Sequence, residues 1–537
     1  MSNLERKLMS GDEAVALAAW HAGVALGAGY PGTPSTEILE HFSDLGGHAE
    51  WSPNEKVALE VAIGAAFGGA RALATMKHVG LNVAADPFFT VAYTGVSGAL
   101  VIVSADDPGM ASSQNEQDNR RYAVAAGVPM VEPSDSQEAY DFTLAAIDLS
   151  ERWHIPVLLR LTTRVCHTQT RVQPRSVPAP AQPRKFVRDV RGRVMIPAYA
   201  RPAHRQLREK LQAMTAWNET CSLNRVIDGD RCLGIVTSGV SYMHAREAAP
   251  QARVLKLGFT YPLPMAKIAA FVRSVDRCVV IEEGDPFLLD AIRAQGLAVE
   301  DRPERFRFGE LNVDRVRRIL AGDTSPEPAC PAGQPPQLCE GCAHRVVFEA
   351  LRTLDCIVAG DIGCYTLGVL PPFSAMDTCV CMGASIGVGL GLRHVLPPDE
   401  ARRVVSVIGD STFVHSGITG LVEMVYNPPP TGHVVIILDN RTTAMTGHQE
   451  HPGTGRKLDH SGTVKWEYAA LGKSLGVQQV RVVEIGREPA EFAAMLQECL
   501  ASGQTVLLVA QRPCILIAQQ LREYEKCATG PGGLQSE

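Results

Sequence analysis

Short apolar runs alternate with helical patterns along most of the chain. Within residues 1–170, the apolar runs 99–104 and 156–161 predict buried strands of a parallel sheet, whose two faces are both covered. Residues 136–151 between them have the spacing of a crossover helix, and residues 12–27 predict another helix with a small-residue face. This alternation predicts an α/β domain.

The alternation of apolar runs with helical patterns returns twice along the chain, each time after a Pro-rich segment that interrupts it. Residues 171–230 lose it, and their Pro- and Arg-rich stretch predicts a linker or extension. A second α/β domain is predicted over 231–325. A Pro/Gly-rich segment, 321–338, leads into a third, predicted over 326–537. The strands predicted in these two domains are 232–239, 252–258, 277–284, 355–363, 403–410, 433–440 and 505–513.

Composition narrows the class of protein. The 537 residues are 45% hydrophobic and 20% charged, so several folded cores are expected. The net charge of −7 argues against a broad surface for nucleic acids or anionic membranes. No apolar run reaches the roughly 18 residues of a membrane span, and the N-terminus lacks a hydrophobic signal core. Because 14 cysteines in so long a chain do not resemble a secreted disulfide scaffold, we expect a cytoplasmic protein with reduced thiols.

Two predicted strands of the third domain end in oxygen ligands. One gives Gly409, Asp410 and Ser411, and the other gives Asp439, Asn440 and Thr442. In an open parallel sheet, ligands bind at the carboxyl ends of the strands. A carboxylate, an amide oxygen and a backbone carbonyl leave positions for two diphosphate oxygens and a water, which is an octahedral Mg²⁺ set. The alternative is a pair of strand-end turns, since Asp and Asn are common turn residues.

The spacing of these residues resembles the thiamine-diphosphate signature, in which Gly-Asp-Gly/Ser is followed about 30 residues later by Asn. A helix predicted to begin near Ser416 would add the positive end of its dipole. Thiamine chemistry also needs a carboxylate at the aminopyrimidine ring, in a water-poor site. The first domain offers Glu55 at the head of a small-residue helix, with Glu60 five residues further on. Both could instead be solvated helix charges.

Long motifs make the chain similar to the 2-oxoacid:ferredoxin oxidoreductases, in particular to the alpha subunits of the indolepyruvate branch. The matching segments are GYPGTPSTEILE, SPNEKVALE and ADDPGMASSQNEQDNR, followed by LCEGCAHR, GDIGCYTLG, MGASIGVGLGL, GDSTFVHSGI and LDNRTTAMTGHQEHPGTG. The resemblance implies the thiamine-diphosphate-binding fold of pyruvate:ferredoxin oxidoreductase, with three α/β domains. Residues 1–170 would bind the pyrimidine, 231–325 would be similar to a transketolase C-terminal domain, and 326–537 would bind the diphosphate.

The resemblance also implies roles for individual residues. Glu55 matches the carboxylate that activates the coenzyme, and Thr33 matches a threonine that contacts the substrate carboxylate. Asp410, Asn440 and the carbonyl of Thr442 match the Mg²⁺ ligands. The remaining residues of the matching diphosphate motifs that we expect to bind cofactor are Gly363, Gly409 and Ser411.

Two further residues carry both a functional and a structural interpretation. Met445 stands where pyruvate-specific relatives have an Asn near the substrate. A thioether makes that wall more apolar, which suits an arylpyruvate such as indolepyruvate or phenylpyruvate, although Met is also ordinary core filling. His415 lies beside the diphosphate motif and could relay a proton or contact the substrate, or it could be hydrogen-bonded for packing alone.

Four cysteines of the third domain resemble the ligands of a cluster beside the thiamine in related enzymes. Cys339 and Cys342 form a Cys-x-x-Cys, Cys364 follows a glycine after the next strand, and Cys514 follows the last strand. Four thiolates can hold one [4Fe–4S] cluster. They could equally hold Zn²⁺, with His344 as a replacement ligand, or be inert buried thiols. Redox logic favours iron, because a thiamine adduct must lose two electrons and the sequence has no convincing nicotinamide or flavin fingerprint.

The resemblance implies oxidative decarboxylation of a 2-oxoacid with coenzyme A, giving acyl-CoA and CO₂. It also implies a smaller beta subunit, in a heteromer built on a dimer. Typical alpha subunits end in a ferredoxin-like segment, whereas this sequence stops soon after Cys514. Electrons are therefore expected to pass to a partner subunit or to ferredoxin or another acceptor. A non-redox thiamine-dependent decarboxylase or carboligase is the first alternative, and a catalytically silent scaffold is the second.

Overall fold

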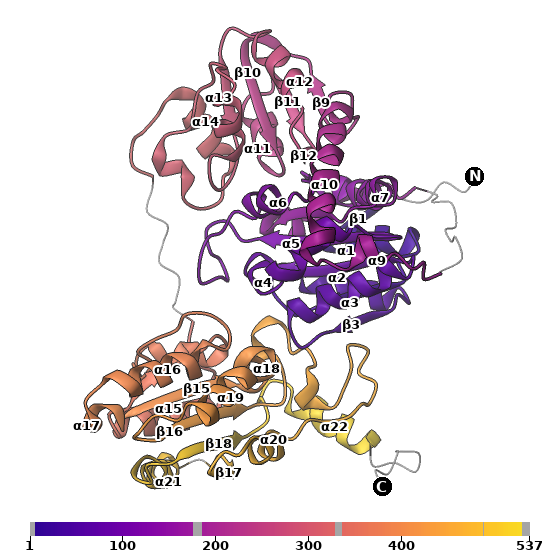
Figure 1. The fold of residues 1–537 in the computed structure, drawn as a ribbon. Coiled ribbons are helices and arrows are strands. Elements are labelled where there is room, and N and C mark those ends of the chain that lie inside the picture. Colours follow the sequence, from indigo (N-terminus) through magenta and orange to yellow (C-terminus); the bar gives the residue numbers. More distant parts are fainter. Residues whose placement is uncertain (1–5, 176–184, 328–335, 487, 529–537) are drawn as a thin grey trace. The chain divides into compact units, whose positions relative to one another are not determined.

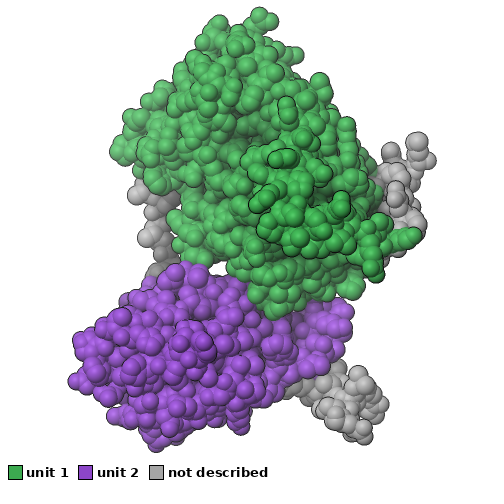
Figure 2. Space-filling model, viewed as in Figure 1, with its two compact units in different colours: residues 1–329 green, residues 330–537 purple. Residues whose placement is uncertain are grey.

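The computed structural model describes residues 6–175, 185–327, 336–486 and 488–528 (Figure 1). The chain consists of two compact units, residues 1–329 and residues 330–537 (Figure 2). Both units are built from parallel sheets with helices, which confirms the predicted α/β class. None of the described helices combines the length and the apolar character that crossing a membrane requires.

The first unit contains a seven-stranded sheet. Its neighbouring strands are parallel, except that β12 pairs antiparallel with β6 at one edge. The strand at its centre, β5, is buried along its whole length, as expected for a strand covered on both faces. In sheet order the strands are β12 (Phe259–Tyr261), β6 (Met130–Val131), β7 (Val157–Thr162), β5 (Ala99–Asp106), β4 (Arg71–Lys77), β2 (Leu26–Gly29) and β3 (Ala49–Trp51).

Helices follow these strands in the order that the sequence predicts, with one correction. The helix predicted over 12–27 ends at His21, because Leu26–Gly29 pair as β2 between β3 and β4. Gly23, at a φ of 67°, makes the turn between the two elements. The helices are α1 (Gly11–His21), α2 (Thr36–Asp44), α3 (Glu55–Phe67), α4 (His78–Val83), α5 (Ala85–Thr94), α6 (Arg120–Ala126), α7 (Ser136–Trp153) and α8 (Thr163–His167).

A four-stranded sheet forms the rest of the first unit. Its order is β13–β10–β11–β9, with β9 antiparallel at the edge and the other pairs parallel. The strands are β9 (Arg225–Ile227), β10 (Asp230–Ser238), β11 (Ala252–Leu257) and β13 (Cys278–Ile281). The helices of this part are α11 (Ser241–Ala248), α12 (Met265–Val272), α13 (Phe287–Arg293) and α14 (Val313–Ala321).

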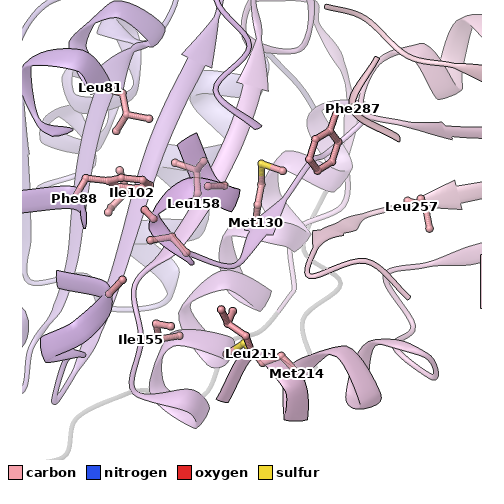
Figure 3. Packing of buried hydrophobic residues seen from close by; sticks show 14 of the residues in the cluster. Leu81, Phe88, Ile102, Met130, Ile155, Leu158, Leu211, Met214, Leu257 and Phe287 are labelled. Atoms are coloured by element: carbon pink, nitrogen blue, oxygen red, sulfur yellow. The ribbon is translucent and has the colours of Figure 1, made fainter. Parts of the chain in front are cut away.

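The segment predicted as a linker or extension contains a packed helix, α10 (Pro197–Asn218). Its apolar residues Leu207, Leu211 and Met214 are buried in the same core cluster as Leu158 of β7 and Leu257 of β11. Figure 3 shows Leu211 and Met214 among the residues of this core. The prediction of a plain linker is therefore wrong for these residues, because proline is frequent only before and at the first turns of the helix. Residues 176–184 of the Pro-rich stretch lie outside the described residues.

We expect Leu211→Ala to lower the free energy of unfolding of the first unit by about 2–5 kcal/mol, since it deletes a buried side chain from the core. Gln206→Ala, at an exposed position of the same helix, is the matched control and should be nearly neutral. Urea unfolding followed by circular dichroism measures both. Equal effects of the two substitutions would show that α10 does not contribute to the core.

The second unit contains a five-stranded parallel sheet in the order β14–β15–β16–β18–β17. The strands predicted over 355–363, 403–410, 433–440 and 505–513 are confirmed, with shorter ends. Separate apolar clusters cover its two faces, one including α15 and α21 and the other α16, α19 and α20. The elements are β14 (Ile357–Ala359), β15 (Val404–Gly409), β16 (His433–Asp439), β17 (Gln479–Glu484), β18 (Thr505–Gln511), α15 (Ala343–Thr353), α16 (Ala384–Val395), α17 (Pro398–Ala401), α18 (Asp410–Thr412), α19 (Ile418–Tyr426), α20 (Tyr468–Leu475), α21 (Pro489–Ala501) and α22 (Ala518–Ala528).

Candidate functional site

The predicted metal ligands of the second unit meet at the carboxyl edge of its sheet. β15 and β16 are neighbouring parallel strands, with Gly409 opposite Leu438, so Asp410 and Asn440 leave the sheet at the same edge. Asp410 is only 2% exposed. One of its oxygens accepts a hydrogen bond from the Ser411 backbone N–H (2.9 Å) and the other from the Arg441 backbone N–H (2.8 Å). The strand alternation thus places these side chains together, as the sequence predicts.

A second carboxylate and a histidine join this edge. The sequence already indicates Asp439 as an oxygen ligand at the strand end, whereas sequence reasoning missed His451. Burial and the negative charge of Asp410 raise the pKa of Asp439 to about 6, although the Gln511 side-chain amide donates to it at 2.8 Å. The imidazole Nε2 of His451 lies 3.3 Å from the Asp410 carboxylate. Asp439 is the last residue of β16 and directly precedes Asn440. A cation bound at this edge would neutralise the negative charge of these two neighbouring buried carboxylates.

The remaining ligand candidates come from the loop after β16. The Asn440 side-chain oxygen accepts a hydrogen bond from the Thr442 backbone N–H at 3.1 Å, so this turn orients both residues. Thr442 is buried, and the neighbouring Thr443 hydroxyl donates to the Ser411 hydroxyl at 2.9 Å. The two strand-end loops are therefore held to each other. A carboxylate, an amide oxygen and a backbone carbonyl in a buried acidic environment fit a Mg²⁺ ion.

Gly363 and Gly409 flank one aromatic ring. A Cβ atom on Gly409 would lie 2.7 Å from the Tyr365 ring, and one on Gly363 would also overlap that ring. The Tyr365 hydroxyl donates to the Ile362 carbonyl at 3.0 Å, which fixes the ring between the two loops. Both glycines are thus required for packing at this edge, in addition to any close approach of a diphosphate to the backbone.

The helix predicted to begin near Ser416 begins six residues earlier. Helical backbone starts with α18 at Asp410 and continues through a π-helical turn, Phe413–Gly417, into α19. The prediction was wrong because the polar residues after the strand already adopt helical geometry. His415 lies in the π-helical turn, 3% exposed, with its Nδ1 2.6 Å from the Ser416 hydroxyl. Such turns occur frequently at functional sites.

Asp361 is a further buried carboxylate that sequence reasoning did not select. It accepts hydrogen bonds from the backbone N–H groups of Ile362 (2.9 Å), Gly383 (2.8 Å) and Ser385 (3.0 Å). These bonds hold the loop after β14 against the start of α16. Burial raises the pKa of Asp361. The available signal was its place after a buried strand, which is equivalent to that of Asp410 after β15.

Met445 is 51% exposed on a short turn after β16. The interpretation of Met445 as ordinary core filling is therefore wrong. The turn is held by the neighbouring Thr446, whose hydroxyl donates to the Gln449 side-chain oxygen at 2.6 Å. An exposed thioether on an ordered turn is available to contact a ligand.

The four predicted cysteines line one cavity of about 90 Å³. Cys342 directly precedes α15, and Cys364 begins a short 3-10 helix, Cys364–Val369. Burial and the neighbouring thiols raise the pKa of Cys364 to about 11. The Cys514 backbone N–H donates to the Asn440 carbonyl at 3.0 Å, and Asn440 itself lines the cavity. The cysteine cavity is therefore continuous with the carboxyl edge that carries the metal-ligand candidates.

The four thiols do not converge tightly on one point. Among the described residues, which include all four thiols, no three of these sulfur atoms lie within 4.8 Å of one another. Sulfur ligands at about 2.3 Å from a single tetrahedral Zn²⁺ would be roughly 3.7 Å apart. His344 also lines the cavity, its Nδ1 has no hydrogen-bond partner within the described chain, and burial lowers its pKa to about 4. The cavity therefore offers four thiols, with His344 as a further donor, to an iron–sulfur cluster or to a zinc ion.

In the first unit, Glu55 and Glu60 have opposite environments. Glu55 is the first residue of α3, only 5% exposed, and Asn54 caps the helix by accepting the Val57 backbone N–H at 3.0 Å. Glu60 is exposed and pairs with Lys56. The solvated-charge interpretation therefore holds for Glu60 and is wrong for Glu55.

Thr33 lies at the same sheet edge as Glu55. It lies within the loop between β2 and α2, where a cis peptide joins it to Pro34, and it is half-buried. Because β2 and β3 are neighbouring parallel strands, Thr33 and Glu55 both follow strands whose carboxyl ends lie together.

Gly80 of α4 lies directly against the Glu55 carboxylate. A Cβ atom on Gly80 would be 2.6 Å from Glu55 Oε1. We expect Gly80→Ala to displace this carboxylate and, with Glu55 in the activating role that the resemblance implies, to reduce turnover about 10²-fold or more. The control is Gly64→Ala in α3, where an added Cβ meets nothing within 4 Å and helix propensity should rise. Steady-state kinetics compares the two variants, and equal rates would show that Gly80 does not position Glu55.

Family models and individual relatives both match long parts of this chain. Residues 17–220 match the thiamine-diphosphate-binding model of pyruvate flavodoxin/ferredoxin oxidoreductases, and residues 361–510 match the C-terminal TPP-binding domain model of thiamine pyrophosphate enzymes. Indolepyruvate oxidoreductase subunit IorA of Archaeoglobus fulgidus is 40% identical over 97% of this chain and 88% of its own length. The chain belongs to the IorA family, whose members are alpha subunits of 2-oxoacid:ferredoxin oxidoreductases.

A second IorA subunit supports the same family membership. The IorA subunit of Methanothermobacter marburgensis is 43% identical over 97% of this chain and 90% of its own. A solved 2-oxoglutarate:ferredoxin oxidoreductase from Magnetococcus marinus, 15% identical, aligns with 59% of this chain and 65% of its own at a TM-score of 0.50, which supports the fold. As a member of the IorA family, the chain is a subunit of a thiamine-diphosphate-dependent 2-oxoacid oxidoreductase. The first matched model extends through α10, in agreement with the packing of that helix.

Proposed function

We propose that this chain oxidatively decarboxylates an arylpyruvate, such as indolepyruvate or phenylpyruvate, with coenzyme A to acyl-CoA and CO₂. The observation that carries the proposal is the four-cysteine cavity that shares Asn440 with the acidic sheet edge. It would put a one-electron acceptor beside the residues that hold the coenzyme. A non-redox decarboxylase would have no use for such a cavity, and membership of an oxidoreductase family also argues against that alternative.

Asp410, Asn440 and the carbonyl of Thr442 would hold a Mg²⁺ ion and, through it, the diphosphate. Their oxygen donors match the preference of this ion, and the buried charge of Asp410 and Asp439 requires a cation at this edge. Gly363, Gly409 and Ser411 would border the diphosphate. When bound, thiamine diphosphate supplies the carbanion that attacks the keto carbon and the electron sink for decarboxylation.

Glu55 would hold a proton between its carboxylate and the aminopyrimidine ring. Its low exposure keeps water away from the carboxylate, which strengthens a hydrogen bond to the ring. Thr33, at the same edge of its sheet, would donate its hydroxyl hydrogen bond to the substrate carboxylate. His415 would contact the substrate or move a proton within the second unit.

Cys339, Cys342, Cys364 and Cys514 would hold one [4Fe–4S] cluster. Their common cavity supports this assignment, and the two-electron oxidation in the proposed reaction favours iron over zinc. The exposed thioether of Met445 supports an aromatic substrate, because it offers an apolar and polarisable contact in place of a hydrogen bond.

The relatives are named as subunits, so we propose that this chain works with a smaller beta subunit in a heteromer built on a dimer. Electrons would leave the cluster to this partner or to ferredoxin or another external acceptor. We also propose a cytoplasmic location, consistent with the unpaired state of the described cysteines.

Product analysis tests the proposed function. The chain and its beta subunit are supplied without oxygen with phenylpyruvate, indolepyruvate, pyruvate or 2-oxoglutarate, with and without coenzyme A and a viologen dye. We expect acyl-CoA and reduced dye only when coenzyme A is present, and faster turnover of the two arylpyruvates. Release of an aldehyde or acyloin without dye reduction would contradict the proposal in favour of the non-redox alternative.

A further inference from the structure

A second group of ligand side chains lies in the first unit, and none of its three members has a role in the proposed reaction. Asp12, Glu37 and His167 each offer an atom that lies within 4.8 Å of the other two, and they form the one such group of three found among the described residues. Asp12 lies in the first turn of α1, Glu37 in the first turn of α2, and His167 at the end of α8. Three elements that are distant in sequence therefore converge on one point.

Three oxygens of the two carboxylates lack an N–H or O–H donor. Asp12 is 1% exposed, and no N–H or O–H group of the described part of the chain donates a hydrogen bond to either of its oxygens. The Oε2 atom of Glu37 is also buried without a partner. Burial and the charge of Glu37 raise the pKa of Asp12, and the nearby Cys166 thiol, a weak donor, offsets only part of this cost. Placing the buried Asp12 carboxylate next to the half-buried Glu37 carboxylate is unfavourable unless something neutralises them.

The backbone at the start of α1 lies close to α8, which helps to bring the three side chains together. The N-terminus of α1 is capped by Ser10 and Glu13, whose side chains each accept the backbone N–H of the other residue, so Asp12 is not needed as a cap. A Cβ atom on Gly11 would overlap the Val165 carbonyl oxygen. Glycine at this position therefore lets the first turn of α1 approach the backbone of α8, which brings Asp12 close to the end of that helix.

We propose that Asp12, Glu37 and His167 bind one divalent transition-metal ion, with Zn²⁺ as the best match. An imidazole nitrogen and two carboxylate oxygens are a donor set that zinc accepts with water as the fourth ligand, whereas Mg²⁺ and Ca²⁺ prefer oxygen alone. The exposed His167 side chain gives the ion access from solvent. An ion on Glu37 would fix the start of α2, one helical turn after Thr33. The inference does not depend on the proposed reaction.

Zinc binding tests this site. The full chain is dialysed against a chelator without oxygen and then against Zn²⁺, and bound metal is measured by mass spectrometry. We expect the wild type to bind about one more zinc ion per chain than His167→Ala or Asp12→Asn, and Zn²⁺ to raise the melting temperature of the wild type more than that of either variant. Zinc taken up by the four cysteines is common to all samples and cancels in the difference.

The matched control is His48→Ala, which removes another exposed histidine of the same unit and should bind as much zinc as the wild type. Because His167 is exposed, its variant is expected to fold even if the Asp12 variant does not. Equal zinc content and equal thermal shifts in the wild type, His48→Ala and His167→Ala would overturn the proposal.

Discussion

Glu55→Gln will reduce 2-oxoacid oxidation by about 10²–10⁴-fold, the range lost with a general acid–base group. Glutamine keeps the size of the side chain and its packing over Gly80, but its amide cannot exchange a proton with the aminopyrimidine ring. Binding of thiamine diphosphate with Mg²⁺ should remain, because the metal-ligand candidates lie in the other unit. Viologen-coupled kinetics measures the first effect, and calorimetry the second.

Deuterium exchange at C2 of the bound coenzyme, followed by NMR, separates loss of activation from loss of fold. Exchange should be slow in Glu55→Gln and fast in the wild type. Glu60→Gln is the matched control, since Glu60 is an exposed carboxylate of the same helix. If Glu55→Gln keeps wild-type exchange and wild-type turnover, the activating carboxylate is elsewhere in the protein.

Cys364→Ala will remove most of the iron and, with it, electron transfer to any external acceptor. We expect the wild-type chain, purified without oxygen, to contain about four iron atoms. Cys364 lies in the common cavity with the other three cysteines, so its loss leaves three ligands for a cluster that needs four. Iron analysis and electron paramagnetic resonance of the reduced protein measure the loss.

Cys232→Ser is the control for this second prediction, because Cys232 is an exposed thiol in the first unit. It should keep the iron content and the spectrum of the wild type. Stoichiometric zinc and no iron in anaerobically purified wild-type protein would contradict the cluster assignment, as would full iron in Cys364→Ala.

The parts of the site that follow from strand alternation could be predicted from the sequence. Asp410 and Asn440 both follow apolar runs, and neighbouring parallel strands necessarily end at the same edge, so their approach needs no knowledge of packing. The cysteines at 339, 342, 364 and 514 were selected as a set through the resemblance, and they do line one cavity.

Contacts between distant segments could not be predicted in this way. Nothing in the local sequence shows that Gly80 lies against Glu55, or that Asp361 accepts backbone hydrogen bonds from the start of α16. The helix α10 was missed because its Pro-rich surroundings obscured the spacing of Leu207 and Leu211. Such features depend on tertiary packing, which overrides local composition.

The most direct measurement for the central claim is the redox state of the cluster after mixing with substrate. The anaerobic chain with its beta subunit, loaded with thiamine diphosphate and Mg²⁺, is mixed with indolepyruvate and frozen for electron paramagnetic resonance. We predict the signal of a reduced [4Fe–4S] cluster, which should be absent without the coenzyme and absent in Glu55→Gln. A cluster that stays oxidised while the loaded wild-type protein consumes indolepyruvate would contradict the account.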